Sequence, residues 1–365
     1  MGFFDRILKR KQKVQVSTYA EFWEWFTENE ASFFEVVKSR NDIEKNFLDH
    51  IFPLLGQLNE GFYLQTGMCN DDTAELVITS DGNFKVMPYV EELVACAPKL
   101  PNWRITAHKP IGGHTMSINM ADHNFNDKTF SFCINEHAAY PDKIDISLVY
   151  QHFNKEEAPL ISNGAYIYLD SYLGELNSLT MIDAINVIGP DDTQKELIDI
   201  KKLSDYLNWR EKEFVEKYDS MRHDTENDQY VALELKTPKG LPIIAVMNQT
   251  LLQWDAKASH PWMAVLDIRY DGSSQNGMPD EVTYQAMDEF EDILVEELKD
   301  LDGYLCLGRE TGDNQRTIFF ACKDFRKPVK VIDQLKLRYA NMEMEVDVFK
   351  DKYWEFLNRY INVFN

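Results

Sequence analysis

Four histidines that lie near one another in the sequence are the first residues with the potential for metal chemistry. They are His108, His114, His123 and His137. Zinc requires its imidazole ligands to converge at about 2.0–2.1 Å from a single ion. The spacing of His108 and His114 fits one half of a zinc-finger pattern, but no closely spaced pair of cysteines precedes them. The pattern therefore favours separate histidines, and we predict neither a metal nor another cofactor.

One cysteine has a spacing typical of a nucleophile and its base. Cys133 precedes His137 by four residues, but it lies between Phe132 and Ile134 in an alternating apolar pattern, which predicts a buried and inert thiol. The sequence contains no G-x-S-x-G, P-loop, G-x-G-x-x-G or H-E-x-x-H motif. The five cysteines form no C-x-x-C pair, so we expect thiols in a reducing cytoplasm rather than a disulfide framework.

Carboxylates are so numerous that a single pair of them carries little information. Asp267 lies on a predicted strand and Asp271 follows it, so the two could flank a catalytic cleft. Arg269 shares a strand face with Asp267, because alternate residues point to the same side, and a cross-strand ion pair explains both residues equally well. Both interpretations stay open.

A strongly acidic helix is predicted over residues 280–301. Its apolar side contains Met287, Phe290, Leu294, Leu298 and Leu301. The rest of its surface contains Asp288, Glu289, Glu291, Asp292, Glu296, Glu297 and Asp300, with Lys299 as the only nearby base. Glu289, Asp292 and Glu296 are spaced three and four residues apart and therefore lie along one stripe. This stripe is either a solvated face that favours solubility or a docking surface for a basic protein partner.

Composition excludes several classes of function. The 365 residues include 61 Asp and Glu against 38 Lys and Arg, which gives a net charge of −23. Such a charge argues against a nucleic-acid partner, because binding phosphates requires clustered Lys and Arg. No apolar run approaches the roughly 20 residues of a membrane span, so we expect no stable membrane insertion.

The first residues differ from the rest of the chain in charge. Residues 1–16 are predicted to form a basic amphipathic tail, in which an apolar face precedes a basic run. The face contains Phe3, Phe4, Ile7 and Leu8, and the run contains Lys9, Arg10, Lys11 and Lys13. The tail is either a weak interfacial anchor or a short helix that docks on its own domain or frays, and the sequence favours the second interpretation.

The elements that must position these residues divide into two α+β domains. The N-terminal domain is predicted over residues 17–218 and includes a connector helix before a polar linker at 219–229. It begins with helices marked by a capping box at Thr18 and Glu21, by Asn29 as the cap of a second helix, and by Asn41 before a third. Strands are predicted at 62–67, 74–79, 103–108, 115–120, 128–135, 144–152 and 179–188, and further helices near 88–96 and 163–175.

The C-terminal domain, residues 230–365, has the clearest pattern. A hairpin at 230–247 precedes β (262–269), α (280–301), β (304–309), β (316–322), α (327–339) and β (342–348), and an aromatic helix follows at the C-terminus. The order βαββαβ is that of a ferredoxin-like sandwich. We therefore predict a ferredoxin-like domain with an extra N-terminal hairpin and a C-terminal helix.

The C-terminal third resembles the bacterial domain-of-unknown-function 695 family. The resemblance rests on Leu241–Asn248, Asp271-Gly272, Asn276–Pro279, Phe290-Glu291-Asp292, Gly308 and Thr311-Gly312. These are loop glycines and core residues, so the resemblance implies a fold and little about chemistry. The fold is similar to that of the B-type regulators of ribonuclease E, which implies binding to a protein rather than catalysis. The N-terminal part, including Ala97–Trp103, resembles only uncharacterised bacterial proteins.

Taken together, the sequence favours a non-catalytic cytoplasmic protein that binds or regulates another protein. A first alternative is an immunity or inhibitor protein that neutralises one enzyme. A second alternative is an enzyme of unrecognised class with its site between the two domains. The sequence leaves the oligomeric state open.

Overall fold

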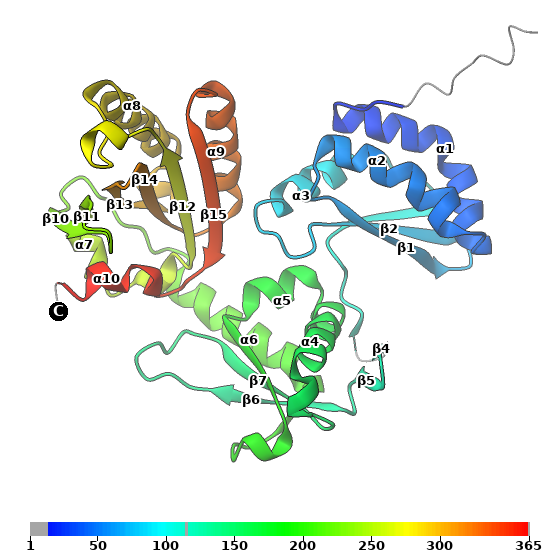
Figure 1. The fold of residues 1–365 in the computed structure, drawn as a ribbon. Helices are drawn as coiled ribbons and strands as arrows, with labels where there is room; N and C mark the ends of the chain where they lie inside the picture. Colours follow the sequence, from blue (N-terminus) through cyan, green and yellow to red (C-terminus); the bar gives the residue numbers. More distant parts are fainter. Residues whose placement is uncertain (1–13, 114–115, 364–365) are drawn as a thin grey trace, which may run out of the picture. The chain divides into compact units, whose positions relative to one another are not determined.

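The structure, a computed structural model, describes residues 14–113 and 116–363 and contains both helices and sheets, as an α+β fold requires (Figure 1). Its described residues form two compact units. Unit 1 comprises those up to Ile111 together with Gly174–Leu176, and unit 2 comprises those of Gly112–Leu173 and from Asn177 onward. Residues 1–13, which include nearly all of the predicted basic tail, lie outside the described residues.

Unit 1 contains a sheet of order β1-β2-β3, in which β1 and β2 are antiparallel and β2 and β3 are parallel. The capping box at Thr18 and Glu21 is confirmed at the start of α1. The predicted second cap is wrong, because the Asn29 side chain donates to Trp25 O inside one continuous helix. The elements are α1 (Tyr19–Ser39), a π-helical turn (Glu44–Leu48), α2 (Asp49–Leu58), β1 (Tyr63–Asn70), β2 (Thr73–Thr79), α3 (Met87–Ala95) and β3 (Trp103–Ala107).

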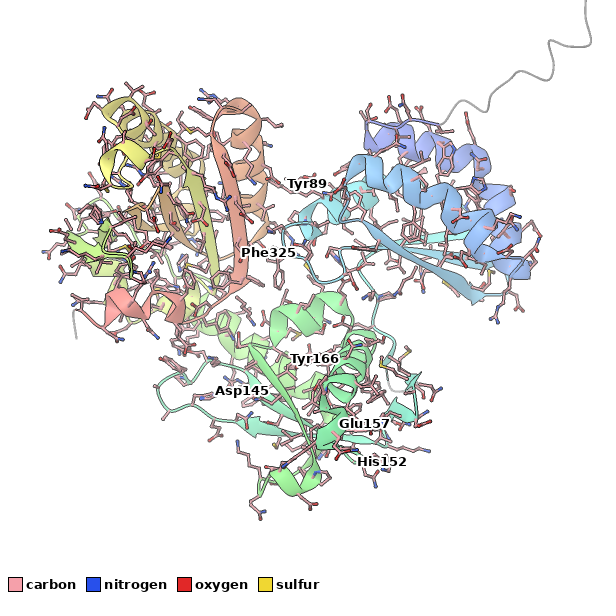
Figure 2. The ribbon with its side chains drawn as sticks, viewed as in Figure 1. Tyr89, Asp145, His152, Glu157, Tyr166 and Phe325 are labelled. Atoms are coloured by element: carbon pink, nitrogen blue, oxygen red, sulfur yellow. The ribbon has the colours of Figure 1, made fainter. Side chains whose placement is uncertain are left out.

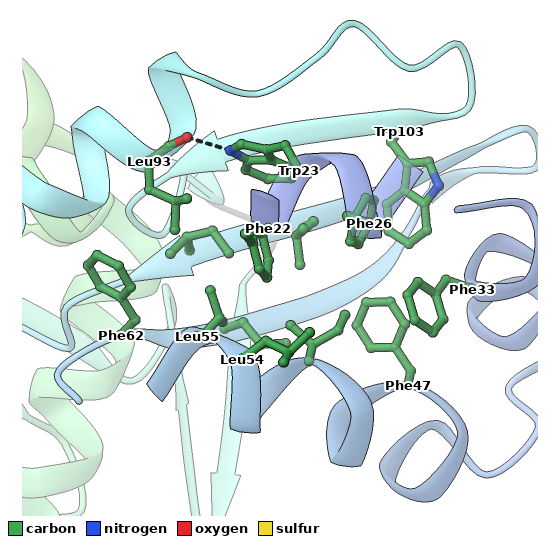
Figure 3. Packing of buried hydrophobic residues seen from close by; sticks show 14 of the residues in the cluster. Phe22, Trp23, Phe26, Phe33, Phe47, Leu54, Leu55, Phe62, Leu93 and Trp103 are labelled. Atoms are coloured by element: carbon green, nitrogen blue, oxygen red, sulfur yellow. Dashed lines mark hydrogen bonds between the residues drawn. The ribbon is translucent and has the colours of Figure 1, made fainter. Parts of the chain in front are cut away.

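Aromatic side chains of α1, of the π-helical turn and of β3 form much of the core of unit 1 (Figure 3). The Phe26 ring meets the Trp103 ring edge-on with centroids 5.2 Å apart, and Phe47 stacks on Trp103 at 5.9 Å. Trp23 Nε1 donates to Leu93 O at 2.7 Å, which satisfies the one polar atom of a buried indole. The aromatic residues at helical spacing therefore pack the helices on the sheet.

The first part of unit 2 is built on the sheet β8-β7-β6-β9, with a small hairpin of β4 and β5 beside it. Helix α4 approaches the hairpin closely, because a Cβ at Gly164 would collide with the Phe125 ring. The elements are β4 (Ser117–Met120), β5 (His123–Asn126), β6 (Phe130–Asn135), β7 (Asp145–Tyr150), α4 (Ala158–Leu173), α5 (Glu175–Met181), β8 (Ala184–Ile188), β9 (Ile198–Asp199) and α6 (Leu203–Tyr218). The first two residues of α5 belong to unit 1.

The second part of unit 2 is a six-stranded sheet of order β10-β11-β13-β14-β12-β15 in which every neighbouring pair is antiparallel. Met263 and Val265 of β12 pack with Trp354 on one face. Ala264 and Leu266 are also buried and point to the other face, so both faces are covered. The elements are β10 (Tyr230–Lys236), β11 (Pro242–Asn248), α7 (Gln249–Leu252), β12 (Trp262–Arg269), α8 (Glu281–Glu297), β13 (Tyr304–Gly312), β14 (Gln315–Cys322), α9 (Arg326–Arg338), β15 (Glu343–Lys350) and α10 (Asn358–Ile361).

Two details of the C-terminal part differ from the sequence expectation. Leu301, assigned to the core, is 57% exposed, because α8 ends at Glu297 and a 3₁₀ turn follows. The expected aromatic helix at the C-terminus is short, since a 3₁₀ turn over Glu355–Leu357 precedes the four residues of α10.

The residues predicted as a linker, 219–229, contain no regular element and contact the C-terminal sheet region. Thr225 donates through its backbone N and its Oγ1 to Asp300 Oδ2 at 2.9 and 2.7 Å. The predicted N-terminal domain, 17–218, thus includes residues of both compact units, whereas 230–365 lies wholly within unit 2. Independent folding of the segment 230–365 stays a prediction.

Candidate functional site

Helix α8 carries the predicted acidic stripe, defined as Glu289, Asp292 and Glu296. The helix begins where the Asp280 side chain accepts a hydrogen bond from Thr283 N at 2.8 Å. Its apolar side is buried through Met287, Phe290, Leu294 and Leu298. All three residues of the stripe are exposed, and within the described part of the chain none of them has a cationic partner within 4.0 Å. The stripe is therefore available to solvent, while its use as a docking surface stays a prediction.

Two other acids of α8, which the sequence assigned to the solvated face, have cationic partners. Asp288 and Glu291 form a charge cluster with Arg309 of β13 and Arg316 of β14. Asp288 Oδ1 lies 2.6 Å from Arg316 Nη1, and Glu291 Oε1 lies 2.8 Å from Arg309 Nη1. The expectation that Lys299 is the only nearby base is wrong, because the hairpin of β13 and β14 brings two arginines under the helix.

Arg316 is the central cation of this charge cluster and is completely buried. Its Nε donates to Thr311 Oγ1 at 3.1 Å, and its guanidinium lies 4.8 Å from the centroid of the Tyr284 ring. Its Nη2 has no hydrogen-bond partner. A buried guanidinium is tolerable only with counter-charges, and half-exposed Asp288 and buried Glu291 supply them.

Glu291 is the buried acid of the cluster and is 8% exposed. Burial raises the pKa of its carboxyl above the ordinary value, although the guanidinium groups of Arg309 and Arg316 act in the opposite direction. Its Oε1 accepts the hydrogen bond from Arg309, whereas its Oε2 makes no hydrogen bond and lies 3.5 Å from Arg316 Nη1. One oxygen of a buried carboxylate therefore still has an unused capacity to accept.

A pocket of about 340 Å³, here called the α8 pocket, opens beside this carboxylate. Apolar side chains form much of its wall, and Glu291, Arg309, Lys299 and Asp300 supply its charges. The apolar side chains are Val246, Val295, Leu298 and Tyr304. Cys306 also lines the pocket, but burial raises the pKa of its thiol to about 12, so it is not a nucleophile near neutral pH.

A bulge in β13 shapes the floor of the α8 pocket. The pairing with β14 shifts register between Cys306 and Gly308, which inserts one extra residue into the strand. Gly308 has φ +130°, and a Cβ there would collide with Val246 O of the neighbouring strand. Only glycine fits this position, and this requirement accounts for one of the loop glycines singled out in the sequence.

Each described histidine of this group has its own acidic neighbour in the structure. His108 pairs with Glu91 at 3.3 Å in unit 1. In unit 2, His123 lies 3.4 Å from Glu157, which precedes α4, and His137 lies 2.7 Å from Asp145 of β7. Figure 2 labels the two acids, Glu157 and Asp145. His114 lies outside the described residues. Among the residues that the structure describes, no group of three or more His, Cys, Asp or Glu could hold a metal.

The other candidate residues of the sequence have local partners. Buried Cys133 lies 3.9 Å from Thr193 Oγ1, while His137 is engaged by Asp145. Arg269 does form a cross-strand ion pair, with Glu343 of β15 at 3.1 Å. Asp267 accepts from Thr317 Oγ1 at 2.6 Å, and Asp271 accepts from Ser273 Oγ at 2.6 Å, so each carboxylate is used for a local structural contact.

A second buried charge group connects the segment just before β8 of the four-stranded sheet with the end of β15 of the six-stranded sheet. Asp183 lies 2.8 Å from both Lys350 Nζ and Lys352 Nζ. Burial lowers the pKa of Lys350 to about 8, although the Asp183 carboxylate opposes this shift. Burial also works against the charge of Asp183, but the two ammonium groups hold the pKa of this carboxyl below its ordinary value. The two ammonium groups share one carboxylate, and each also donates to a backbone carbonyl, Lys350 to Thr180 O and Lys352 to Asp142 O, which is typical of a structural ion cluster.

A third buried carboxylate, Glu175, lies in unit 1 and is fully enclosed. Thr79 Oγ1 donates to its Oε2 at 2.5 Å, and Gly82 N donates to its Oε1 at 2.9 Å. Lys109 N donates to Oε2 at 3.1 Å. Donors converge on both oxygens, so this carboxylate holds the loop after β2 rather than presenting an acid to a substrate.

Comparison with known proteins is informative for the C-terminal third alone. A family of unknown function, DUF695, matches residues 236–361, which confirms the predicted resemblance for that part of the chain. No curated protein and no solved structure matches the chain. No helix in the described part of the chain is long and apolar enough to cross a membrane. The DUF695 match includes α8, β13 and β14, and therefore the acidic stripe and the whole charge cluster.

Proposed function

We propose that this chain is a non-catalytic cytoplasmic protein that binds or regulates a basic protein partner through the acidic stripe of α8. The observation that carries the proposal is the division of charge on one helix. Asp288 and Glu291 are neutralised by Arg309 and Arg316, whereas the stripe has no cationic partner among residues 14–113 and 116–363. Uncompensated surface charge in a protein of net charge −23 attracts positively charged partners and speeds their association.

Apolar residues beside the stripe support a docking role over a purely solvated one. Val295 follows Asp292 by three residues and is 41% exposed, and Val282 near the start of α8 is 76% exposed. Stable interfaces combine a desolvated apolar centre with a charged rim. The face of α8 offers both kinds of side chain.

The architecture around α8 supports the same proposal. We infer that residues 230–365 form a ferredoxin-like domain, because β12-α8-β13-β14-α9-β15 has the βαββαβ order and its strands lie in the order β13-β14-β12-β15. The B-type regulators of ribonuclease E, to which this fold is similar, act by binding a protein. A cytoplasmic location suits the five cysteines, each of which is a free thiol.

The test compares the wild-type chain with a triple variant, Glu289→Lys, Asp292→Lys and Glu296→Lys. A matched control changes Glu24, Glu28 and Glu35, three exposed acids of α1, to Lys, which alters the net charge equally. Partners are captured from the native lysate, and the association rate of the purified partner is measured at low and high salt. The stripe variant should associate more slowly and with less salt dependence, while the control variant should lose much less.

The melting temperature is the folding control, since exposed substitutions usually change stability by about 0.5 kcal/mol or less each. An unchanged set of captured proteins at an unchanged melting temperature would reduce the stripe to a solvated face. If the captured partner is an enzyme that loses activity on binding, the protein acts as an inhibitor.

A further inference from the structure

We propose that a groove between α1 and α2 is the docking site of the chain's own first thirteen residues. The two helices lie side by side (Figure 1), and the groove between them, here called the α1–α2 groove, has a volume of about 640 Å³. It lies wholly within unit 1, so docking there does not depend on the acidic stripe or on the proposed function. Its apolar lining consists of Val14, Trp25, Phe33, Val36, Pro53 and Leu54.

The chain enters the groove at the first residues that the structure describes. Val14 lines the groove and is 45% exposed. Gln57 near the end of α2 fixes this entry, because its Oε1 accepts from Val16 N at 2.9 Å and its Nε2 donates to Val14 O at 3.5 Å. The residues before Val14 are therefore attached at one end of the groove. A segment attached beside its site has an effective concentration of roughly millimolar, which a separate molecule would have to exceed.

The lengths of the groove and of the attached segment match. The groove is lined from Trp25 to Val36 on one wall and from Asn46 to Gln57 on the other. Each of these spans covers about 16 Å at the helical rise of about 1.5 Å per residue. As a helix, residues 3–13 would cover about 15 Å, which is nearly the whole groove.

The groove offers the two kinds of surface that an amphipathic segment requires. The segment has an apolar face, whose removal from water is favourable, made of Phe3, Phe4, Ile7 and Leu8. The apolar lining of the groove supplies a surface on which this face can be buried. The lining also contains polar side chains, among them Ser32, Asp49 and His50, beside which the polar side of the segment can stay hydrated.

The charges of the two surfaces are opposite. Residues 1–13 contain five Lys and Arg against one Asp, which gives a net charge of +4. Residues 19–58, which include α1 and α2, contain eight Asp and Glu against three Lys and Arg, which gives −5. Attraction therefore favours docking of the basic segment on these helices. The same basic residues attract an anionic membrane, but the net charge of −23 opposes the approach of the whole protein to such a surface.

The experiment titrates a labelled peptide of residues 1–13 into two full-length proteins, wild type and a tail variant that carries Phe4→Asp and Ile7→Asp. In the tail variant the attached segment can no longer bury its apolar face, so the groove should be open to the peptide. We expect the tail variant to bind the peptide at least about tenfold more tightly than wild type, whose own segment competes at a high effective concentration. Equal binding by the two proteins, or no binding by the tail variant, overturns the inference.

Two further substitutions in the tail variant locate the bound peptide. Ser32 lines the groove, whereas its neighbour Ala31 is exposed on α1 outside the groove. Ser32→Arg narrows the groove and repels the basic peptide, so it should weaken binding at least about tenfold. Ala31→Arg adds the same charge and should change binding little. Both residues are exposed, so neither substitution should alter folding much, and equal effects of the two on binding overturn the inference.

A fluorine resonance inside the groove reports the attached segment directly. With 5-fluorotryptophan incorporated, the Trp25 resonance should differ between wild type and the tail variant, because the groove is covered in wild type alone. An unchanged resonance overturns the inference, and binding of wild type to phosphatidylserine vesicles would then assign the segment to lipid. A wild-type dimer that becomes a monomer in the tail variant would assign it to the groove of a second copy and would also overturn docking within one chain.

Discussion

His260 should make the stability of unit 2 depend on pH. The imidazole is completely buried, and its ring centroid lies 5.6 Å from that of Trp254. Ser259 Oγ lies 2.6 Å from Ala256 O and donates to it, so the same oxygen accepts the Nδ1–H of His260 at 2.8 Å. Its Nε2 has no hydrogen-bond partner. A proton added to Nε2 would therefore create a buried charge without an acceptor.

The direction of the effect follows from the two pKa values. Burial, helped by the positive charges of Lys323 and Arg222 and by His223, lowers the pKa of folded His260 to about 3. The unfolded value is about 6.5. Between these values the unfolded chain binds a proton that the folded chain refuses, so stability is complete above about pH 6.5 and is lost progressively as the pH falls toward 3.

The loss of folding stability at pH 5 can be calculated without the exact pKa of His260 in the folded protein. The folded histidine is almost entirely neutral at pH 5, so the loss depends on the protonation of the unfolded chain alone. With an unfolded pKa of about 6.5, the loss relative to pH 7.5 is about 2 kcal/mol. Such a loss is a substantial fraction of the stability of a typical domain.

The assay compares the free energy of unfolding in urea at pH 7.5 and pH 5 for wild type, His260→Gln and His152→Gln. Fluorine resonances of 5-fluorotryptophan at Trp254 and Trp354 report this region of unit 2 separately from unit 1. Wild type and His152→Gln, which changes an exposed histidine, should each lose about 2 kcal/mol more than His260→Gln between the two pH values. The same pH slope for His260→Gln and wild type would refute the reasoning, whatever the stability of the variant at pH 7.5.

Three further substitutions test other buried contacts by thermal or urea unfolding. Asp183→Asn leaves Lys350 and a second buried lysine without their counter-charge and should cost about 3–5 kcal/mol; a cost below about 1 kcal/mol would show that water reaches the group. Glu175→Gln replaces one of two oxygens, both of which accept hydrogen bonds, with an NH2 group that faces a donor; it should destabilise unit 1 by about 1–3 kcal/mol, with no change expected in the unfolding of the six-stranded sheet. Gly308→Ala should destabilise the six-stranded sheet by at least about 1–3 kcal/mol, whereas Gly67→Ala, where a Cβ meets nothing within 4 Å, should be close to neutral; equal costs would contradict the role of the bulge.

Local patterns predicted the elements of the fold well. The capping box at Thr18 and the apolar side of α8 through Phe290 are properties of neighbouring residues, and the structure contains both. Alternating apolar residues likewise predicted β6 and β7, which pair in the structure. Such alternation indicates a strand because the pleat sends successive side chains to opposite faces. The prediction that Asn29 caps a second helix was wrong, because asparagine suits a helix start but also fits inside a helix whose aromatic side is buried.

The acidic residues of α8 were only partly predictable from the sequence. Composition and helical spacing alone placed Glu289, Asp292 and Glu296 along one stripe, and they are exposed. The same reasoning treated Asp288 and Glu291 as surface acids, because a helix pattern does not reveal what lies beneath it. Their partners come from a hairpin about 20 residues further along the chain, and only the pairing of β13 with β14 brings the two arginines under α8. Local sequence determines which face of a helix is apolar, whereas the burial of a charge depends on the counter-charge that tertiary structure supplies.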